Sequence, residues 1–183
     1  MAQKTLEGKK IAVLMTDGVE QVEYTGPREF LEGHGAQVIL VSPKGKGEQV
    51  QGLNHMDQAD KFTVERSVAD ARPADFDALV LPGGVANPDA LRLSPESIAL
   101  IGDFARADKP MAAICHGPWT LIDAGIVKGK RVTSWPSLKT DLTNAGAQWT
   151  DETVVVDGKL ITSRNPGDIP AFNDAILKAL TAA

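Results

Sequence analysis

The sequence predicts an α/β fold in which a mostly parallel sheet is covered by helices on both faces. Strand-like and helix-like segments alternate along the whole chain, an order typical of β-α-β units. The strand-like segments are short runs that are apolar at nearly every position, as expected for strands buried on both faces. A length of 183 residues suits one domain, and we expect a single domain over residues 1–183.

The first β-α-β unit is expected within residues 11–41. Residues 11–15 predict a buried strand, and a helix follows from the early twenties to residue 32. Pro27 is expected in the first turn of that helix or at a kink, and the glycines at 33 and 35 end it. Residues 37–41 form the second strand.

Over residues 44–75 the pattern of apolar residues predicts secondary structure less clearly than it does in the first unit. Residues 49–56 and 62–65 could be short strands of an inserted hairpin. Residues 78–81 predict a third buried strand, which runs directly into Pro82-Gly83-Gly84.

A helix and a further strand are expected between residues 94 and 115. Ser94-Pro95 is typical of an N-cap followed by proline at the first helical position. The helix after it places Ile98, Ile101, Phe104 and Ala105 on one face. Residues 110–114 predict the next strand, which ends at Cys115 and leads into a helix to about Ala124.

The last third of the chain predicts a strand at 131–133, a polar helix at 137–144 and a hairpin within 153–162. Asp157-Gly158 suits the tight turn of that hairpin. The final segment is amphipathic, with one apolar face made by Phe172, Ala175, Ile176, Ala179 and Leu180.

Composition narrows the function classes. The net charge is −5, the pI is about 5.2 and there is no basic run, so we expect neither nucleic acid nor an anionic membrane as a partner. No apolar run is long enough to cross a membrane, and residues 1–10 lack the apolar core of a signal peptide, so we expect a cytoplasmic protein. A single cysteine allows no internal disulfide, and His34, His55 and His116 show no metal-ligand spacing, so we expect no metal.

Chemically interesting residues follow three of the predicted strands. They lie in residues 17–23, at Gly83-Gly84 and in Cys115-His116-Gly117. The carboxyl ends of parallel strands meet at one edge of a sheet, where ligands bind. We therefore expect these three stretches to form one site.

Cys115 is expected at a sharp turn between a strand and a helix, as in a nucleophile elbow. A helix N-terminus there would lower the pKa of its thiol. The alternative is a buried, inert cysteine. His116 could act as its general base or acid, or be a polar turn residue. The backbone amides of Gly84 and His116 could face an oxyanion.

Two acidic residues, Glu20 and Glu23, follow the first strand. Such residues are usually solvated acids at a helix start. If one of them faces the sulfur instead, it must be protonated to donate a hydrogen bond, which requires a raised pKa.

Five motifs together resemble the ThiJ/PfpI superfamily (also called DJ-one), and its PfpI-type branch in particular. The resemblance covers residues 10–180 and is carried by Gly18-Val-Glu20-Gln-Val-Glu23, Leu79-Val-Leu-Pro-Gly-Gly84, Ala113-Ile-Cys-His-Gly-Pro118, Val132-Thr-Ser-Trp-Pro136 and Thr162-Ser-Arg-Asn-Pro-Gly167. It implies a flavodoxin-like three-layer sandwich with a nucleophile elbow, similar to glutamine amidotransferases.

The resemblance also implies roles for individual residues. Cys115 would be the nucleophile, Glu23 the residue that contacts its sulfur and His116 its catalytic partner, with Gly84 and His116 as oxyanion donors. A further carboxylate from a neighbouring subunit maps to Asp89, within Asn87-Pro88-Asp89. This chain departs from the family there, because it has Asp rather than Glu in a loop that is one residue longer.

The resemblance implies a stress-response hydrolase that needs no cofactor and assembles as a homodimer or larger homo-oligomer. Its substrate would be methylglyoxal or a glycated adduct, attacked by the Cys115 thiolate. Two alternatives use the same sulfur. One is a PfpI-type peptidase with Cys115, His116 and Asp89, and the other is a redox sensor or chaperone in which Cys115 is oxidised reversibly.

Overall fold

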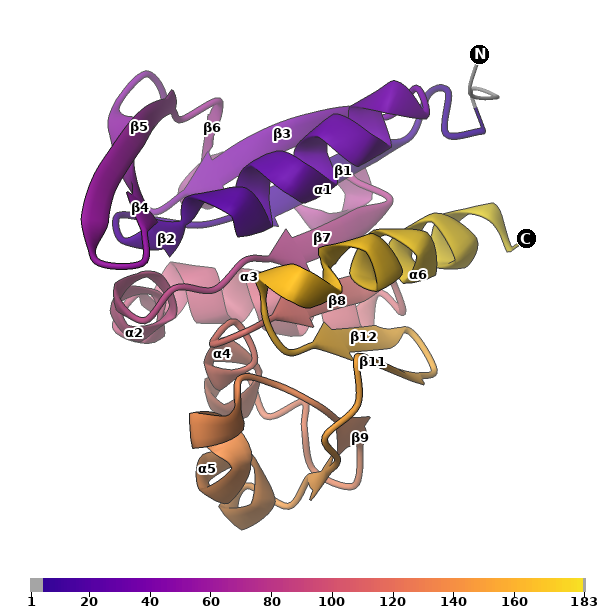
Figure 1. Cartoon of the computed structure of the whole chain (residues 1–183). Helices are drawn as coiled ribbons and strands as arrows, with labels where there is room; N and C mark the ends of the chain where they lie inside the picture. The colour runs from indigo at the N-terminus through magenta and orange to yellow at the C-terminus, as the bar shows by residue number, and fades with distance from the viewer. Residues whose placement is uncertain (1–4, 183) are drawn as a thin grey trace.

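The computed structural model describes residues 5–182, and a seven-stranded sheet forms the centre of the fold (Figure 1). The strand order is β11-β12-β8-β7-β1-β3-β6. Every neighbouring pair is parallel except β11–β12. The strands are β1 (Lys10–Leu14), β3 (Gln37–Ser42), β6 (Arg66–Ser67), β7 (Ala78–Leu81), β8 (Met111–Ile114), β11 (Val154–Asp157) and β12 (Leu160–Ser163).

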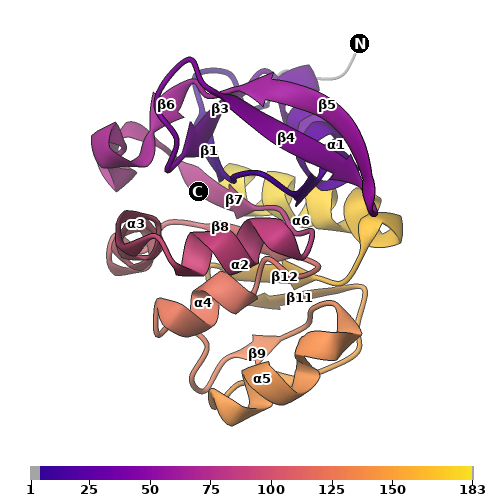
Figure 2. The ribbon, with the colours of Figure 1, turned by 90° about the vertical axis from the view of Figure 1, so that its left-hand side faces the viewer.

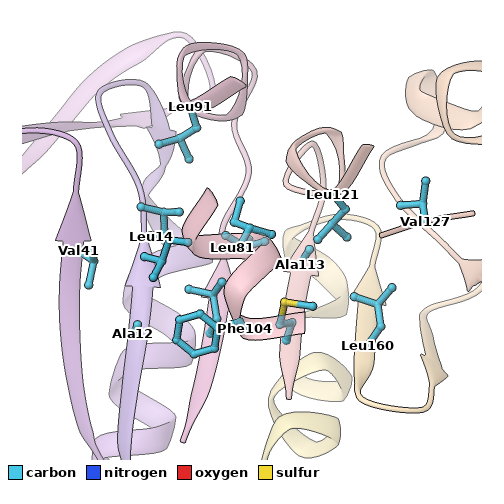
Figure 3. Close-up of a cluster of buried hydrophobic side chains, with 14 of the residues drawn as sticks. Ala12, Leu14, Val41, Leu81, Leu91, Phe104, Ala113, Leu121, Val127 and Leu160 are labelled. Atoms are coloured by element: carbon cyan, nitrogen blue, oxygen red, sulfur yellow. The ribbon is translucent and has the colours of Figure 1, made fainter. Parts of the chain in front are cut away.

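Helices cover both faces of this sheet, which confirms the predicted flavodoxin-like α/β sandwich (Figures 1 and 2). One face carries α1 (Gln21–Gly33) and α6 (Ile169–Thr181), and the other carries α2 (Ala86–Arg92), α3 (Pro95–Arg106) and α4 (Trp119–Asp123). Successive strand residues point to opposite faces, so Leu14 joins the core under α3 while Val13 joins the core under α1. Figure 3 shows the first of these two cores, with Phe104 of α3 against Leu14 and Leu81. Both faces are buried, which is why the central strands are apolar at successive positions.

Two smaller sheets lie outside the central one. The predicted hairpin insertion is present as β4 (Gln49–Asn54) and β5 (Asp57–Thr63), and β2 (Val19–Glu20) pairs with β4. The strand expected at 131–133 exists as β9 (Arg131–Val132), but it pairs with β10 (Gln148–Trp149) rather than with the central sheet. The polar helix expected nearby is α5 (Lys139–Asn144), preceded by a short 3-10 turn.

Local features differ from the sequence-based expectations in four places. Pro27 lies in the second turn of α1, which continues to Gly33. The helix after Cys115 begins only at Trp119. The tight turn of the β11–β12 hairpin is Gly158-Lys159, one residue later than expected, because Asp157 pairs with Leu160. The fourth is α2, a helix that the Asn, Pro and Asp residues of its first turn concealed and that packs through buried Leu91.

The fold places three loops side by side at the carboxyl edge of the sheet. They follow β1, β7 and β8, which are neighbouring parallel strands. This is the edge at which we expected the site. Across residues 5–182, no helix combines the length and apolar character that crossing a membrane requires.

Candidate active site

Cys115 occupies a strained turn directly after β8. Its φ is +61°, a left-handed conformation that non-glycine residues rarely adopt. Its backbone N–H donates to the Ser163 carbonyl at 3.1 Å, and its carbonyl accepts from the Trp135 N–H at 2.9 Å. A side chain at Gly117 would collide with the Leu81 carbonyl, so glycine is needed for the turn to fold back on β7. This is the geometry of the expected nucleophile elbow.

His116 turns back onto the cysteine that precedes it. Its Nδ1 lies 3.2 Å from the Cys115 Sγ, and its Nε2 lies 3.5 Å from the Ser137 Oγ. Two indoles flank the ring: Trp135 stacks on it with centroids 5.8 Å apart, and Trp119 meets it edge-on at 5.3 Å. Burial among these groups lowers the pKa of His116, so the imidazole is neutral at pH 7 and available as a base.

Glu23 extends from α1 into the same space and is fully buried. Its Oε2 accepts a hydrogen bond from the Gly83 N–H at 2.8 Å. Within residues 5–182 no hydrogen-bond partner lies against its Oε1. Burial raises the pKa of Glu23 to about 8, while the Gly83 and Cys115 hydrogen bonds act in the opposite direction. At neutral pH this carboxyl is therefore mostly protonated and can donate.

The glycines after β7 let these groups approach one another. A Cβ at Gly83 would lie 2.7 Å from the Cys115 Cβ and 2.7 Å from the Glu23 Oε2, so any side chain there would fill the space between the two. Gly84 has a φ of +77°, and a Cβ there would collide with the Gly18 carbonyl. The backbone amides of Gly84 and His116 act on the Cys115 sulfur and lower the pKa of its thiol. These are the two amides that the sequence predicted as oxyanion donors.

The thiol of Cys115 does not have the lowered pKa that we expected. Burial and the negative charge of an ionised Glu23 raise its pKa well above the ordinary range, although the Gly84 and His116 amides lower it. The expectation rested on a helix beginning at the cysteine, but α4 begins at Trp119 and has five residues, so its dipole acts too far away. The resting site at neutral pH is therefore a thiol beside a neutral imidazole.

A cavity of about 550 Å³ opens above the sulfur. Its lining includes Cys115, His116, Trp135, Val85, Met56 and Pro166. The β4–β5 hairpin closes one side, where the His55 N–H donates to the two carboxylate oxygens of Glu20 at 3.1 and 3.4 Å. No group of three or more His, Cys, Asp or Glu side chains within residues 5–182 is arranged to hold a metal ion.

The structure brings all of the predicted site residues to this cavity. Glu20, Glu23, Gly84, Asp89, Cys115 and His116 line it. Asp89 stands on α2 at the cavity wall, but among the described residues the side-chain partners of His116 are Cys115 and Ser137. Asp89 therefore does not complete a triad within one chain.

Sequence reasoning missed two contributors. The sequence predicts Ser137 in a polar helix, whereas the structure places it in the short turn before α5, beside His116. The sequence shows Gly83 as one of a glycine pair, but only the structure shows that it separates Cys115 from Glu23. The Trp-Pro motif at 135–136 was the available signal that this segment belongs to the site.

Comparisons with known proteins agree with this geometry. A sequence model of the DJ-1/PfpI family matches residues 9–179. The chain is 42% identical over 175 residues to protein/nucleic acid deglycase 2 of Escherichia coli K12, covering 95% of this chain and 99% of that protein. It is 42% identical over 176 residues to the putative cysteine protease YraA of Bacillus subtilis 168, covering 94% and 98%. The crystal structure of Drosophila melanogaster DJ-1beta matches with a TM-score of 0.85 at 33% identity, over 96% of this chain and 91% of that chain.

Proposed function

The chain belongs to the DJ-1/PfpI family, and on that premise we propose that it is a cysteine-dependent hydrolase of methylglyoxal or of the early adducts that methylglyoxal forms with amines and thiols. The similarity to an Escherichia coli protein named a deglycase supports this choice of substrate class. The observation that carries the proposal is the Cys115 Sγ, 3.2 Å from a neutral His116 Nδ1, at the wall of a cavity of about 550 Å³.

The first step is attack of sulfur on a carbonyl carbon. His116 Nδ1 accepts the thiol proton as the C–S bond forms, so no free thiolate has to exist beforehand. The electron pair of the C=O bond moves to oxygen, where backbone amides stabilise the charge. Protonated Glu23 then delivers its proton to that oxygen. The product is a hemithioacetal bound to Cys115.

The second stage moves two protons and adds one water. Glu23, now a carboxylate, removes the C–H proton of the hemithioacetal carbon and returns it to the neighbouring carbonyl carbon. The hydroxyl proton of the hemithioacetal passes to the oxygen of that carbonyl, which becomes a hydroxyl. That isomerisation leaves a thioester on Cys115. Water cleaves the thioester to lactic acid. The thiol regains the proton held by His116, and Glu23 takes up the proton released by the water. The sum is methylglyoxal plus one water giving lactic acid, with no cofactor required.

The same site bears on the two alternative functions. A peptidase of the predicted type needs the Asp89 carboxylate of a neighbouring subunit against His116. A redox sensor needs an exposed thiol of low pKa, whereas Cys115 is buried and its pKa is raised. The burial and the raised pKa of the thiol favour the carbonyl reaction over the redox sensor.

Product analysis tests the proposal. The pure protein is incubated with methylglyoxal in an amine-free buffer and, separately, with unfolded casein, and each reaction is repeated with Cys115→Ala. We expect lactate from the wild type alone and no casein cleavage. Equal lactate formation by Cys115→Ala would refute the proposal, and casein cleavage that requires Cys115 would replace it with the peptidase.

A further inference from the structure

The side-chain amide of Asn87 is fully buried beneath the loop that follows β7. Its Oδ1 accepts from the Thr16 N–H at 2.7 Å, and its Nδ2 donates to the carbonyls of Pro82 and Gly83, each at 3.0 Å. A backbone N–H on one side and two carbonyls on the other leave only one orientation of the amide that satisfies all three contacts. Both protons of the NH₂ group are thereby used.

The two carbonyls held by Asn87 belong to consecutive peptide groups, and each of those groups aims its N–H at a reacting side chain. The peptide group that carries the Pro82 carbonyl contains the Gly83 N–H, which donates to the Glu23 Oε2 at 2.8 Å. The next group carries the Gly83 carbonyl and contains the Gly84 N–H, which lowers the pKa of the Cys115 thiol.

A trans peptide group is planar, with its C=O and N–H on opposite sides. Holding the oxygen therefore fixes the direction of the hydrogen. We propose that Asn87 is a positioning residue whose one NH₂ group sets the orientation of both amide donors of the site, the Gly83 N–H toward Glu23 and the Gly84 N–H toward Cys115. It touches neither the sulfur nor the cavity and acts through the two peptide groups.

We call the two hydrogen bonds from the Asn87 NH₂ group to the carbonyls of Pro82 and Gly83 the brace. The loop needs them because it contains two consecutive glycines. Glycine adopts left-handed and right-handed backbone conformations with similar ease, and Gly84 has a φ of +77°. Apart from Asn87, the Gly83 carbonyl accepts only a long hydrogen bond of 3.4 Å from the Glu20 N–H among the described backbone contacts. The contact to Thr16 ties the amide to the loop two residues beyond β1, next to the edge of the sheet.

The effect of the brace on Cys115 can be measured separately from its effect on the stability of the fold. Any buried asparagine that loses its hydrogen bonds lowers the stability of the fold. A positioning role adds a second effect, because the Gly84 N–H stabilises negative charge on sulfur. Loss of the brace should therefore make Cys115 harder to ionise, and a merely structural role would leave that ionisation unchanged.

The test uses Asn87→Ser, which removes the NH₂ group, and Asn87→Asp, which keeps the shape and the acceptor but replaces the donor. Asn173→Ser is the matched control: Asn173 is also buried, but it lies on α6 and outside the cavity lining. Cys115 is the only cysteine of the chain, so its rate of alkylation by iodoacetamide as a function of pH reports on this thiol alone. Thermal unfolding is measured in parallel.

We expect Asn87→Ser to move the alkylation profile about one pH unit to the alkaline side, which lowers the rate tenfold in the pH range where rate rises with ionisation. Asn173→Ser should keep the wild-type alkylation profile at whatever temperature it unfolds. Turnover of methylglyoxal should lose kcat with KM within about twofold, as expected for a group that acts in the transition state. If Asn87→Asp does not fold, the alkylation profile of Asn87→Ser alone tests the positioning role of Asn87.

A folded Asn87→Ser protein with the wild-type alkylation profile overturns the inference. The turnover part rests on the proposed function, but alkylation needs no substrate. If the wild type makes no lactate while Asn87→Ser still shifts the profile, the proposed function fails and the positioning role of Asn87 stands.

Discussion

The His116 Nδ1 lies 3.2 Å from the Sγ of the preceding residue, Cys115. Adjacent side chains normally diverge, and the left-handed backbone of Cys115 is what turns these two toward each other. Burial raises the pKa of the thiol and lowers the pKa of the imidazole. Both shifts favour the neutral pair over the ion pair. The nucleophile is therefore generated during attack rather than stored as a thiolate.

Replacing the base should slow the reaction without removing the sulfur. In His116→Gln the thiol has no proton acceptor at 3.2 Å, and we expect kcat/KM to fall by about a hundredfold or more. Stopped-flow measurement of methylglyoxal loss checks this. Ser137→Ala is the control. The Ser137 Oγ lies 3.5 Å from the His116 Nε2, and because this contact is weak, its loss should lower kcat/KM by less than about threefold. Unchanged kcat/KM in His116→Gln would remove His116 from the mechanism.

Glu23 makes the stability of the fold depend on pH. Its pKa is raised to about 8 in the folded chain, above the unfolded value, so the folded state holds the proton more tightly. The resulting stabilisation is complete below the unfolded pKa of about 4.3 and is lost as pH rises toward 8, at up to about 1.4 kcal/mol per pH unit. Glu23→Gln cannot ionise and should lack this contribution.

Urea unfolding of the wild type and of Glu23→Gln at several pH values measures how the free energy of unfolding changes with pH. The variant should gain stability relative to the wild type as pH rises from 5 to 8. A difference that stays constant over this range would show that Glu23 ionises as easily in the folded chain as in the unfolded one.

Gly83→Ala should abolish most of the activity while lowering the stability of the fold only modestly. The added Cβ would lie 2.7 Å from both the Cys115 Cβ and the Glu23 Oε2, so the two must separate. We expect at least about a hundredfold loss of kcat/KM and a destabilisation of about 1–3 kcal/mol. Gly33→Ala, at the end of α1 with nothing within 4 Å of the new Cβ, should keep full activity. Comparable activity in the two variants would contradict the assigned role of Gly83.

Trp135 keeps water from one face of His116. The indole stacks on the imidazole and lines the cavity. Because burial is what lowers the pKa of His116, Trp135→Ala should raise that pKa toward its ordinary value. The acid limb of the kcat/KM profile, where His116 becomes protonated, should then move to higher pH, and Trp135→Phe should restore most of the shift. Coincident acid limbs in all three proteins would mean that another group sets the limb.

Much of the fold was predictable because its signals are local. The short apolar runs at residues 11–15, 78–81 and 110–114 predict buried strands, and all three strands lie at the centre of the sheet, the first ending at Leu14. The short helix α2 was not predictable from local signals, since Asn87, Pro88 and Asp89 favour a turn. The helix is stabilised by tertiary contacts, among them the burial of Leu91 and the hydrogen bonds of Asn87. The separate pairing of β9 with β10 depends likewise on contacts between distant segments.

The sequence predicted which residues line the site better than it predicted their pKa values. The motifs brought Cys115, Glu23 and His116 together correctly on the cavity. The direction of the thiol pKa could not be read from them, because it depends on how deeply the sulfur is buried and on where α4 begins. The bracing role of Asn87 was hidden for the same reason, since its partners are backbone groups that carry no sequence signal.

Carbon-13 NMR with methylglyoxal labelled at its aldehyde carbon tests the central claim, that Cys115 attacks a carbonyl, most directly. Glu23→Gln should accumulate the hemithioacetal, because water can supply the hydroxyl proton that Glu23 delivers in the wild type, whereas neither glutamine nor water can move the C–H proton. We predict a new protein-bound resonance in Glu23→Gln at the chemical shift of a carbon bonded to oxygen and sulfur, and no such resonance in Glu23→Gln/Cys115→Ala. The same resonance in the double variant, or its absence from Glu23→Gln at saturating methylglyoxal, would contradict the account.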